Sequence, residues 1–223
     1  MKWHTAIGLV VMLLVLSGCA RMLGTVSPPT RYFVLSPINL DSSVDDSATI
    51  SDSSATAAKG DIPAKTEIAL AIEPIQIPSY LDRAEIVVRT GDNELDIDEF
   101  HKWGESIQSN LSRALIENLS ILFASDKIYL IPSKKRQDPN FRIALRIKKF
   151  ERSHDGTTIL SLRWMLYSPE KKALFRENVL LTGQVVGEDD YPAIVKAMSS
   201  LWGEFSQRIV QNVQKQQTVM IPK

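Results

Sequence analysis

The middle of the chain alternates apolar and polar residues with the period of a β-strand. From residue 141 to 148 the odd positions are Phe, Ile, Leu and Ile, and the even positions are Arg, Ala, Arg and Lys. A second alternation over residues 157–167 follows a turn signal at Asp155-Gly156. Because side chains point alternately to the two faces of a strand, each segment has one core face and one solvated face. A further strand over residues 174–186 would complete an antiparallel meander.

Two longer segments carry the 3.6-residue period of an amphipathic helix. The first runs through residues 103–122 and the second through residues 190–213. We expect Asp96 or Asp98 to cap the first helix, because a carboxylate oxygen can accept hydrogen bonds from the amides of the first turn. Both helices bury one apolar stripe, so their main role is structural.

Shorter apolar runs at residues 31–37, 67–77 and 85–89 predict further strands. A change of phase at Lys148-Lys149-Phe150 predicts a β-bulge. The fold class predicted is α+β in two layers, a mostly antiparallel sheet of about six strands with two long amphipathic helices on one face.

The amino terminus predicts export and lipid attachment. A basic start and the apolar run of residues 6–16 are too short to span a bilayer and are typical of a signal peptide over residues 1–18. Leu16-Ser17-Gly18-Cys19 resembles the bacterial lipobox, and Cys19 is the only cysteine among 223 residues. We expect Cys19 to carry a covalent diacylglycerol and an N-acyl chain, which anchor a protein without a membrane-spanning helix.

The rest of the chain divides into a tether, one domain and a tail. Residues 19–29 form the lipidated terminus and tether, and residues 30–215 a single α+β domain. Within it, residues 41–58 are dominated by Ser, Asp, Thr and Ala and predict a disordered insertion. The Gln-containing residues 216–223 form a tail without a core signal.

Composition and motifs exclude several function classes. Lys and Arg number 26 and Asp and Glu 26, a balance that argues against a nucleic-acid partner. The Ser/Asp-rich insertion lacks the EF-hand spacing, and neither His101 nor His154 has companions at metal-ligand spacing, so we expect no metal and no cofactor. Glycine-rich phosphate loops and the Gly-x-Ser-x-Gly elbow of hydrolases are absent from the sequence. The chain is predicted not to be an enzyme.

Two surfaces are candidates for binding. Arg142, Arg146 and Lys148 share one strand face, where they would meet an acidic partner or phospholipid head groups, or simply water and cross-strand acids. The loop between two predicted strands presents an aromatic and an apolar side chain beside two charges. Its candidate partner-contact residues are Tyr80, Leu81, Asp82 and Arg83.

Several short motifs, in order, resemble the ABC-type transport auxiliary lipoproteins of the PqiC type. They are the lipobox at Cys19 and the segments 29–35, 77–83 with 86–89, 100–105 and 110–119. The long insertion at residues 41–58 departs from that family. The resemblance implies a periplasm-facing lipoprotein of the outer membrane that works with an MCE-domain protein in lipid traffic between membranes, as a ring of subunits. Ala20, where enterobacterial lipoproteins retained at the inner membrane have Asp, agrees with outer-membrane placement.

Two alternatives to an accessory lipoprotein remain at this stage. A periplasmic enzyme acting on the envelope would use the acidic run that contains Asp96 and Asp98 as paired carboxylates. A lipoprotein that itself binds lipid would need an apolar cavity, whereas the alternation predicts a filled core.

Overall fold

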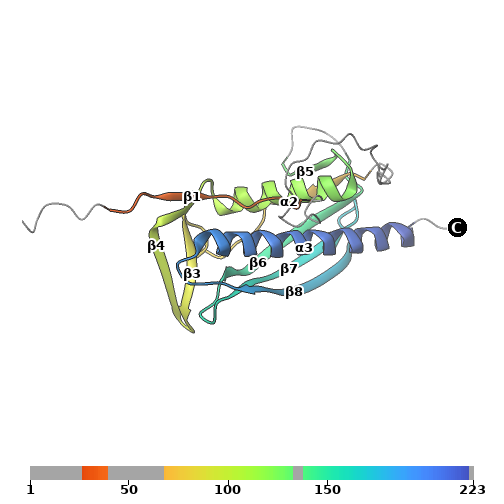
Figure 1. Ribbon diagram of the computed structural model, residues 1–223. Coiled ribbons are helices and arrows are strands. Elements are labelled where there is room, and N and C mark those ends of the chain that lie inside the picture. Colours follow the sequence, from red (N-terminus) through yellow and green to blue (C-terminus); the bar gives the residue numbers. More distant parts are fainter. Residues whose placement is uncertain (1–26, 40–67, 133–137, 221–223) are drawn as a thin grey trace, which may run out of the picture.

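The computed structural model describes residues 27–39, 68–132 and 138–220. Eight strands and two helices make up this part of the chain (Figure 1). The strands are β1 (Arg31–Phe33), β2 (Leu70–Ile72), β3 (Glu85–Gly91), β4 (Glu94–Trp103), β5 (Ile128–Leu130), β6 (Phe141–Arg152), β7 (Thr157–Tyr167) and β8 (Ala173–Val185). The helices are α2 (Ile107–Phe123) and α3 (Tyr191–Met220).

Strands β6, β7 and β8 form the predicted antiparallel meander. Leu145 lies opposite Trp164, and Leu162 lies opposite Val179, so the apolar residues of all three strands share one face. The register shifts between Ile147 and Lys149, which confirms the bulge. The turn before β7 requires a glycine, because Gly156 has a φ of 86° and a Cβ there would lie 2.7 Å from a Val185 methyl.

The sheet is mixed and curled, which corrects the prediction of a mostly antiparallel sheet of about six strands. The second edge of β6 pairs in parallel with β2 at Phe141–Ile143 and with β3 at Arg152 alone. In Figure 1 the β3–β4 hairpin stands across the end of the meander, where the sheet curls. Strands β1 and β5 extend the sheet through parallel pairs with β4 and β2. β1 and β2 lie within the predicted strands at residues 31–37 and 67–77. Their parallel partners are distant in sequence, so the alternation does not reveal the pairing.

The first helix begins later than predicted, and neither Asp96 nor Asp98 caps it. Its N-cap is Ser106, whose Oγ accepts a hydrogen bond from the Ser109 amide at 3.2 Å. The residues from Glu94 to Trp103 form β4 instead, which pairs with both β3 and β1. Trp103 therefore joins the core from a strand and not from the helix.

The two helices pack on each other, and α3 also packs along β7 and β8. Figure 1 shows them side by side along the strands. Trp202 of α3 donates its indole hydrogen bond to the Leu111 carbonyl of α2 at 3.1 Å. Its ring lies among Phe150 and Phe205, with centroids 6.1 and 5.4 Å away. Helix α3 continues to Met220, beyond the predicted end at residue 213, since Gln and Lys favour helix without adding to its buried stripe.

Candidate functional site

The loop before β3, predicted to contact a partner, is fastened to β6. The Tyr80 hydroxyl donates to Oε2 of Glu151 at 2.7 Å and also lies 3.2 Å from the Lys148 carbonyl oxygen. Leu81 is 5% exposed and belongs to the core. The side chain of Leu81 is therefore not offered to a partner, and Tyr80 holds the loop in place.

Glu151 is the centre of this fastening. Its side chain is fully buried, and Oε1 accepts a hydrogen bond from Nε of Arg89 at 2.6 Å. Burial raises the pKa of Tyr80 well above its usual range, and the Glu151 carboxylate raises it further. A buried carboxylate thus links the loop to β3 and to the bulge of β6. This link is not visible in the sequence, because Glu151 looks like an ordinary polar residue at the end of a strand.

Asp82 and Arg83 form the exposed part of the predicted contact loop. Nε of Arg83 lies 3.1 Å from Oε2 of Glu85, and this hydrogen bond lowers the pKa of Glu85. The two residues border a surface hollow of about 290 Å³ whose other lining residues are Ala84, Trp103, Glu105 and Ser106. Both signs of charge therefore surround a small hollow beside a tryptophan.

A second structured surface is formed by the segment after β1, which lies on both helices. The Leu35 amide donates to Oδ1 of Asn110 at 2.9 Å, and the Ile38 amide donates to Oδ1 of Asn118 at 2.8 Å. The Ser36 amide donates to the Ser199 hydroxyl of α3 at 3.1 Å. Both asparagines are fully buried. The chain that leads from the predicted anchor is thus bound to α2 and α3 through its backbone.

Replacing Asn118 with Ala is expected to lower the free energy of unfolding by about 2 kcal/mol, because the Ile38 amide loses its acceptor and the buried Ser206 hydroxyl loses the donor that Asn118 supplies. Amide hydrogen exchange at Ile38 should accelerate more than exchange in the strand pairs of the meander. Urea denaturation and exchange measured on the same protein test both statements. Serine at position 112, which bonds only within α2, gives the control: Ser112→Ala should leave Ile38 protected, and equal exchange in both variants would contradict the assignment.

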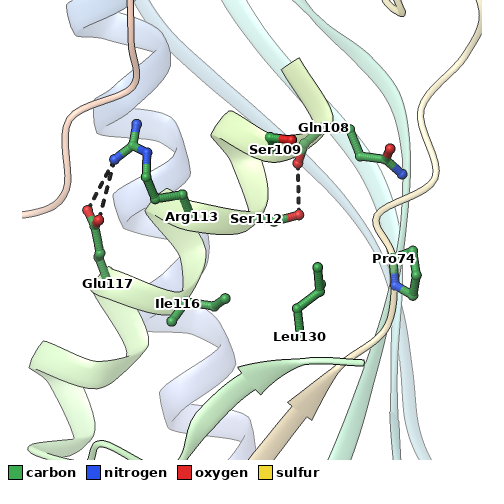
Figure 2. A pocket seen from close by; sticks show the side chains of 8 residues that line it. All are labelled: Pro74, Gln108, Ser109, Ser112, Arg113, Ile116, Glu117 and Leu130. Carbon is green, nitrogen blue, oxygen red and sulfur yellow. Dashed lines mark hydrogen bonds and ion pairs between the residues drawn. The ribbon is translucent and has the colours of Figure 1, made fainter. Parts of the chain in front are cut away.

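A groove borders α2 on its side toward β5 (Figure 2). Its volume is about 450 Å³, and its lining includes Pro74, Ile116 and the 37% exposed Leu130. Arg113 lies on its rim, within 3.3 Å of Oε2 of Glu117 and 2.9 Å of Oε1 of Glu105. The guanidinium is thus neutralised by two carboxylates, and the groove offers an apolar floor with little net charge.

The acidic run is a set of turn and strand contacts. Oδ1 of Asp96 accepts from the Ile97 amide at 2.9 Å. Asp98 accepts from the Phe100 amide at 2.7 Å and lies 2.7 Å from Nδ1 of His101. The His101 ring stacks on Tyr191 with centroids 3.8 Å apart. Within residues 27–39, 68–132 and 138–220, no three His, Cys, Asp or Glu side chains are grouped as metal ligands.

The environment of Asp98 predicts an acid-sensitive contribution to stability. Burial alone would raise the pKa of Asp98, but the Phe100 amide and the His101 ring outweigh it and hold that pKa below its ordinary value of about 3.9. A carboxyl whose pKa is lower in the folded state than in the unfolded state stabilises the fold at pH values above its unfolded pKa. This stabilisation is lost as the pH falls through the folded pKa. Between about pH 6 and about pH 3, the Asp98→Asn variant should therefore lose less thermal stability than the wild type. Equal losses of thermal stability in the variant and the wild type would contradict this prediction.

The predicted anchor lies outside the described residues. This concerns the signal peptide of residues 1–18, Cys19, most of the tether and the insertion at residues 41–58. In the part of the chain that the structure does describe, no helix is long and apolar enough to cross a membrane. Lipid attachment at Cys19 stays a prediction.

Known proteins match most of this chain. Residues 49–210 match the family of ABC-type transport auxiliary lipoprotein components. The chain is 24% identical over 144 residues to the intermembrane transport lipoprotein PqiC of Escherichia coli (strain K12), which is 65% of this chain and 74% of the relative. The PqiC of Shigella flexneri matches to the same extent.

Solved structures share the fold. A crystal structure of a protein from Xanthomonas campestris has a TM-score of 0.60 at 14% identity, covering 71% of this chain and 93% of that one. The crystal structure of an uncharacterized protein has a TM-score of 0.57 at 20% identity, covering 67% and 96%. With the family match spanning more than half of its residues, the chain belongs to the ABC-type transport auxiliary lipoprotein components.

Proposed function

We propose that the protein is a lipid-anchored accessory component of an intermembrane lipid transport system. In this proposal Cys19 holds it at the outer membrane, where it faces the periplasm and docks an MCE-domain partner. The observation that carries the proposal is the family match over residues 49–210. The E. coli and Shigella relatives, both named as intermembrane transport lipoproteins, support it.

The fold supports an anchored role through the way its first strand is held. Between Cys19 and Arg31 the chain can extend at most about 40 Å. β1 then pairs in parallel with β4, and the Gly104 amide donates to the Phe33 carbonyl at 2.8 Å. The segment beyond is bound to Asn110 and Asn118. Tension on the anchor would therefore pass into the sheet and into both helices.

The exposed charges of the contact loop are the proposed docking point for the partner. Asp82 and Arg83 stand beside the hollow that Trp103 lines, and Glu151 fixes the loop through Tyr80. A preorganised loop binds with a smaller loss of conformational entropy than a mobile one. Tyr80, Asp82 and Arg83 act together in this proposal, Tyr80 by positioning the two charges.

Replacing both Asp82 and Arg83 with Ala is expected to weaken capture of the MCE-domain partner at least about tenfold, as for the loss of a contact worth more than about 1.4 kcal/mol. Thermal unfolding should change little, because both side chains are exposed. Binding is measured with the purified partner. The matched control is Asp155→Ala with Lys171→Ala, which removes one charge of each sign at the turns of the meander. Full binding by the Asp82/Arg83 variant would remove the loop from the proposal.

The proposal extends to a ring of subunits, as the family resemblance implies. A closed ring needs a contact in which two different surfaces of neighbouring copies meet. The mass of the particle extracted in mild detergent tests this extension independently of partner binding, and a monomer would contradict it.

A further inference from the structure

The face of the meander opposite α3 carries a concentration of positive charge. Arg146 of β6 lies directly opposite Arg163 of β7, and Arg176 of β8 lies opposite Met165. Arg142 and Lys149 continue the row on β6. We call this surface, made of Arg142, Arg146, Lys149, Arg163, Arg176 and Leu180, the cationic face.

No ion pair between described residues neutralises the charges of the cationic face. Nε of Arg146 donates to Oε1 of Gln76 at 2.8 Å, and Nε of Arg163 donates to Oδ1 of Asn178 at 3.0 Å, so neutral amides orient both guanidinium groups. Nε of Arg142 is buried and lacks a hydrogen-bond partner among the described residues. Of the outward positions of β6, β7 and β8, one carries a carboxylate, Glu151, and that group is buried against Arg89 and Tyr80.

This arrangement is unfavourable for the isolated domain. Like charges directly opposite each other on neighbouring strands destabilise a sheet. The whole chain has no net charge, and an acidic run that includes Asp92, Glu94 and Asp96 lies in the β3–β4 hairpin. The positive charge is therefore a local excess, placed on one face, and an anionic surface is its natural complement.

Apolar side chains accompany the charges and identify the kind of surface. Leu180 is 66% exposed, lies opposite Ser161 and is two residues from Asn178 on the same face of β8. Met165 and Tyr167 of β7 are partly exposed on the same face. Arginine binds phosphate through paired N–H donors, while leucine and tyrosine enter the boundary between head groups and acyl chains. We propose that the cationic face binds the anionic head groups of a phospholipid membrane.

The geometry of the anchor fits this contact. The inference rests on the proposed function, because a lipid on Cys19 would keep the domain at a membrane. The tether between Cys19 and Arg31 spans at most about 40 Å, so the whole domain would stay close to the bilayer that holds the anchor. The terminal nitrogens of Arg146 and Arg163 would then contact phosphate oxygens, with Leu180 inserted between head groups.

The test uses the full lipidated chain with Leu180→Cys, labelled with an environment-sensitive fluorophore. The protein is inserted into vesicles of phosphatidylcholine or of an equal mixture of phosphatidylcholine and phosphatidylglycerol. We expect a blue shift of emission in the mixed vesicles alone, and its loss at 1 M salt, where the screening length falls to about 3 Å. The same label at Val219→Cys, an exposed position on α3, should show no shift.

Charge variants identify the residues responsible. Arg146→Gln with Arg163→Gln should abolish most of the shift while leaving thermal stability equal or higher, since a repulsive pair is removed. Lys196→Gln with Lys215→Gln, two exposed positions of α3, removes the same charge and should leave the shift unchanged. A shift unaffected by the arginine changes, or equal in both lipids, would overturn the inference. So would a response to poly-glutamate without one to the mixed vesicles, which would identify an acidic protein as the partner.

The mass of the labelled protein separates failure of this inference from failure of the anchor. One label means that Cys19 is blocked by lipid, and two labels mean that it is free. With one label and no shift, the cationic face does not bind lipid although the anchor is present. With two labels, the proposed anchor is wrong, and the shift measured after Cys19→Ala, which removes the second label, reports on the cationic face alone.

Discussion

Replacing Trp202 with Ala is expected to lower the free energy of unfolding by about 4 kcal/mol, the largest effect of a single substitution that we predict. Trp202 is fully buried where α3 crosses the meander, against Phe150 and Phe205. Its loss leaves a cavity that the helix and strands cannot close, and it removes the hydrogen bond to the Leu111 carbonyl. Since domains of this size are stable by about 5–15 kcal/mol, the variant should be close to unfolding at growth temperature.

Urea denaturation measures this effect, with an unchanged slope showing that the two-state comparison holds. Trp202→Phe is the matched control, because it retains an aromatic ring and loses the indole hydrogen bond; its expected loss is about 2 kcal/mol. A loss below about 1 kcal/mol for Trp202→Ala would mean that α3 does not pack on the meander as described.

Replacing Glu151 with Ala is expected to lower the free energy of unfolding by about 3 kcal/mol. Arg89, whose side chain is 16% exposed, would then remain nearly buried without its counter-charge. The Tyr80 hydroxyl would also lose its acceptor at 2.7 Å. The contact loop should become mobile, and limited proteolysis near Asp82 should accelerate.

Two variants separate the charge from the hydrogen bond. Glu151→Gln keeps an oxygen acceptor for Tyr80 but removes the charge opposite Arg89. Its free energy of unfolding should lie between those of the wild type and Glu151→Ala. Tyr80→Phe removes one hydrogen bond and is expected to cost about 1 kcal/mol. If Glu151→Ala lowered the free energy of unfolding no more than Tyr80→Phe does, the ion pair with Arg89 would contribute nothing to stability. The loop would then be held by packing alone.

Long helices and strands were predictable from the sequence, because burial of one face places apolar residues at the period of the element over many positions. Strands β6 and β7 have 12 and 11 residues, and both helices bury a continuous stripe. β2 and β5 have three residues each. β2 lies within the predicted strand at residues 67–77, but the parallel partners of both strands depend on tertiary contacts between distant parts of the chain.

The segment from Glu94 to Trp103 is a strand that the sequence pattern did not predict, because most of its residues are polar. Its acidic side chains resemble a turn and a helix start, yet it pairs on both sides with β3 and β1. The sequence Gly91-Asp92-Asn93 is typical of a hairpin turn, and such a turn requires a returning strand. That requirement favours a strand in the position of β4 and a helix start nearer to Ser106.

The candidate site was predictable in part. The contact loop was identified from its sequence, but its buried Leu81 and its link to Glu151 depend on the packing of the loop against β6. Asn110 and Asn118 are residues from which a second structured surface could have been predicted. They lie eight residues apart on the apolar side of α2, where a buried amide needs a partner, and that partner is the segment after β1.

The proposed function is tested most directly by identifying what co-purifies with the tagged protein from detergent-solubilised membranes. We expect mass spectrometry to find an MCE-domain protein with the wild type, and much less of it with Cys19→Ala, which lacks the anchor that brings the two together. Recovery of a tightly bound phospholipid or a hydrolytic activity, without such a partner, would contradict an accessory role in transport.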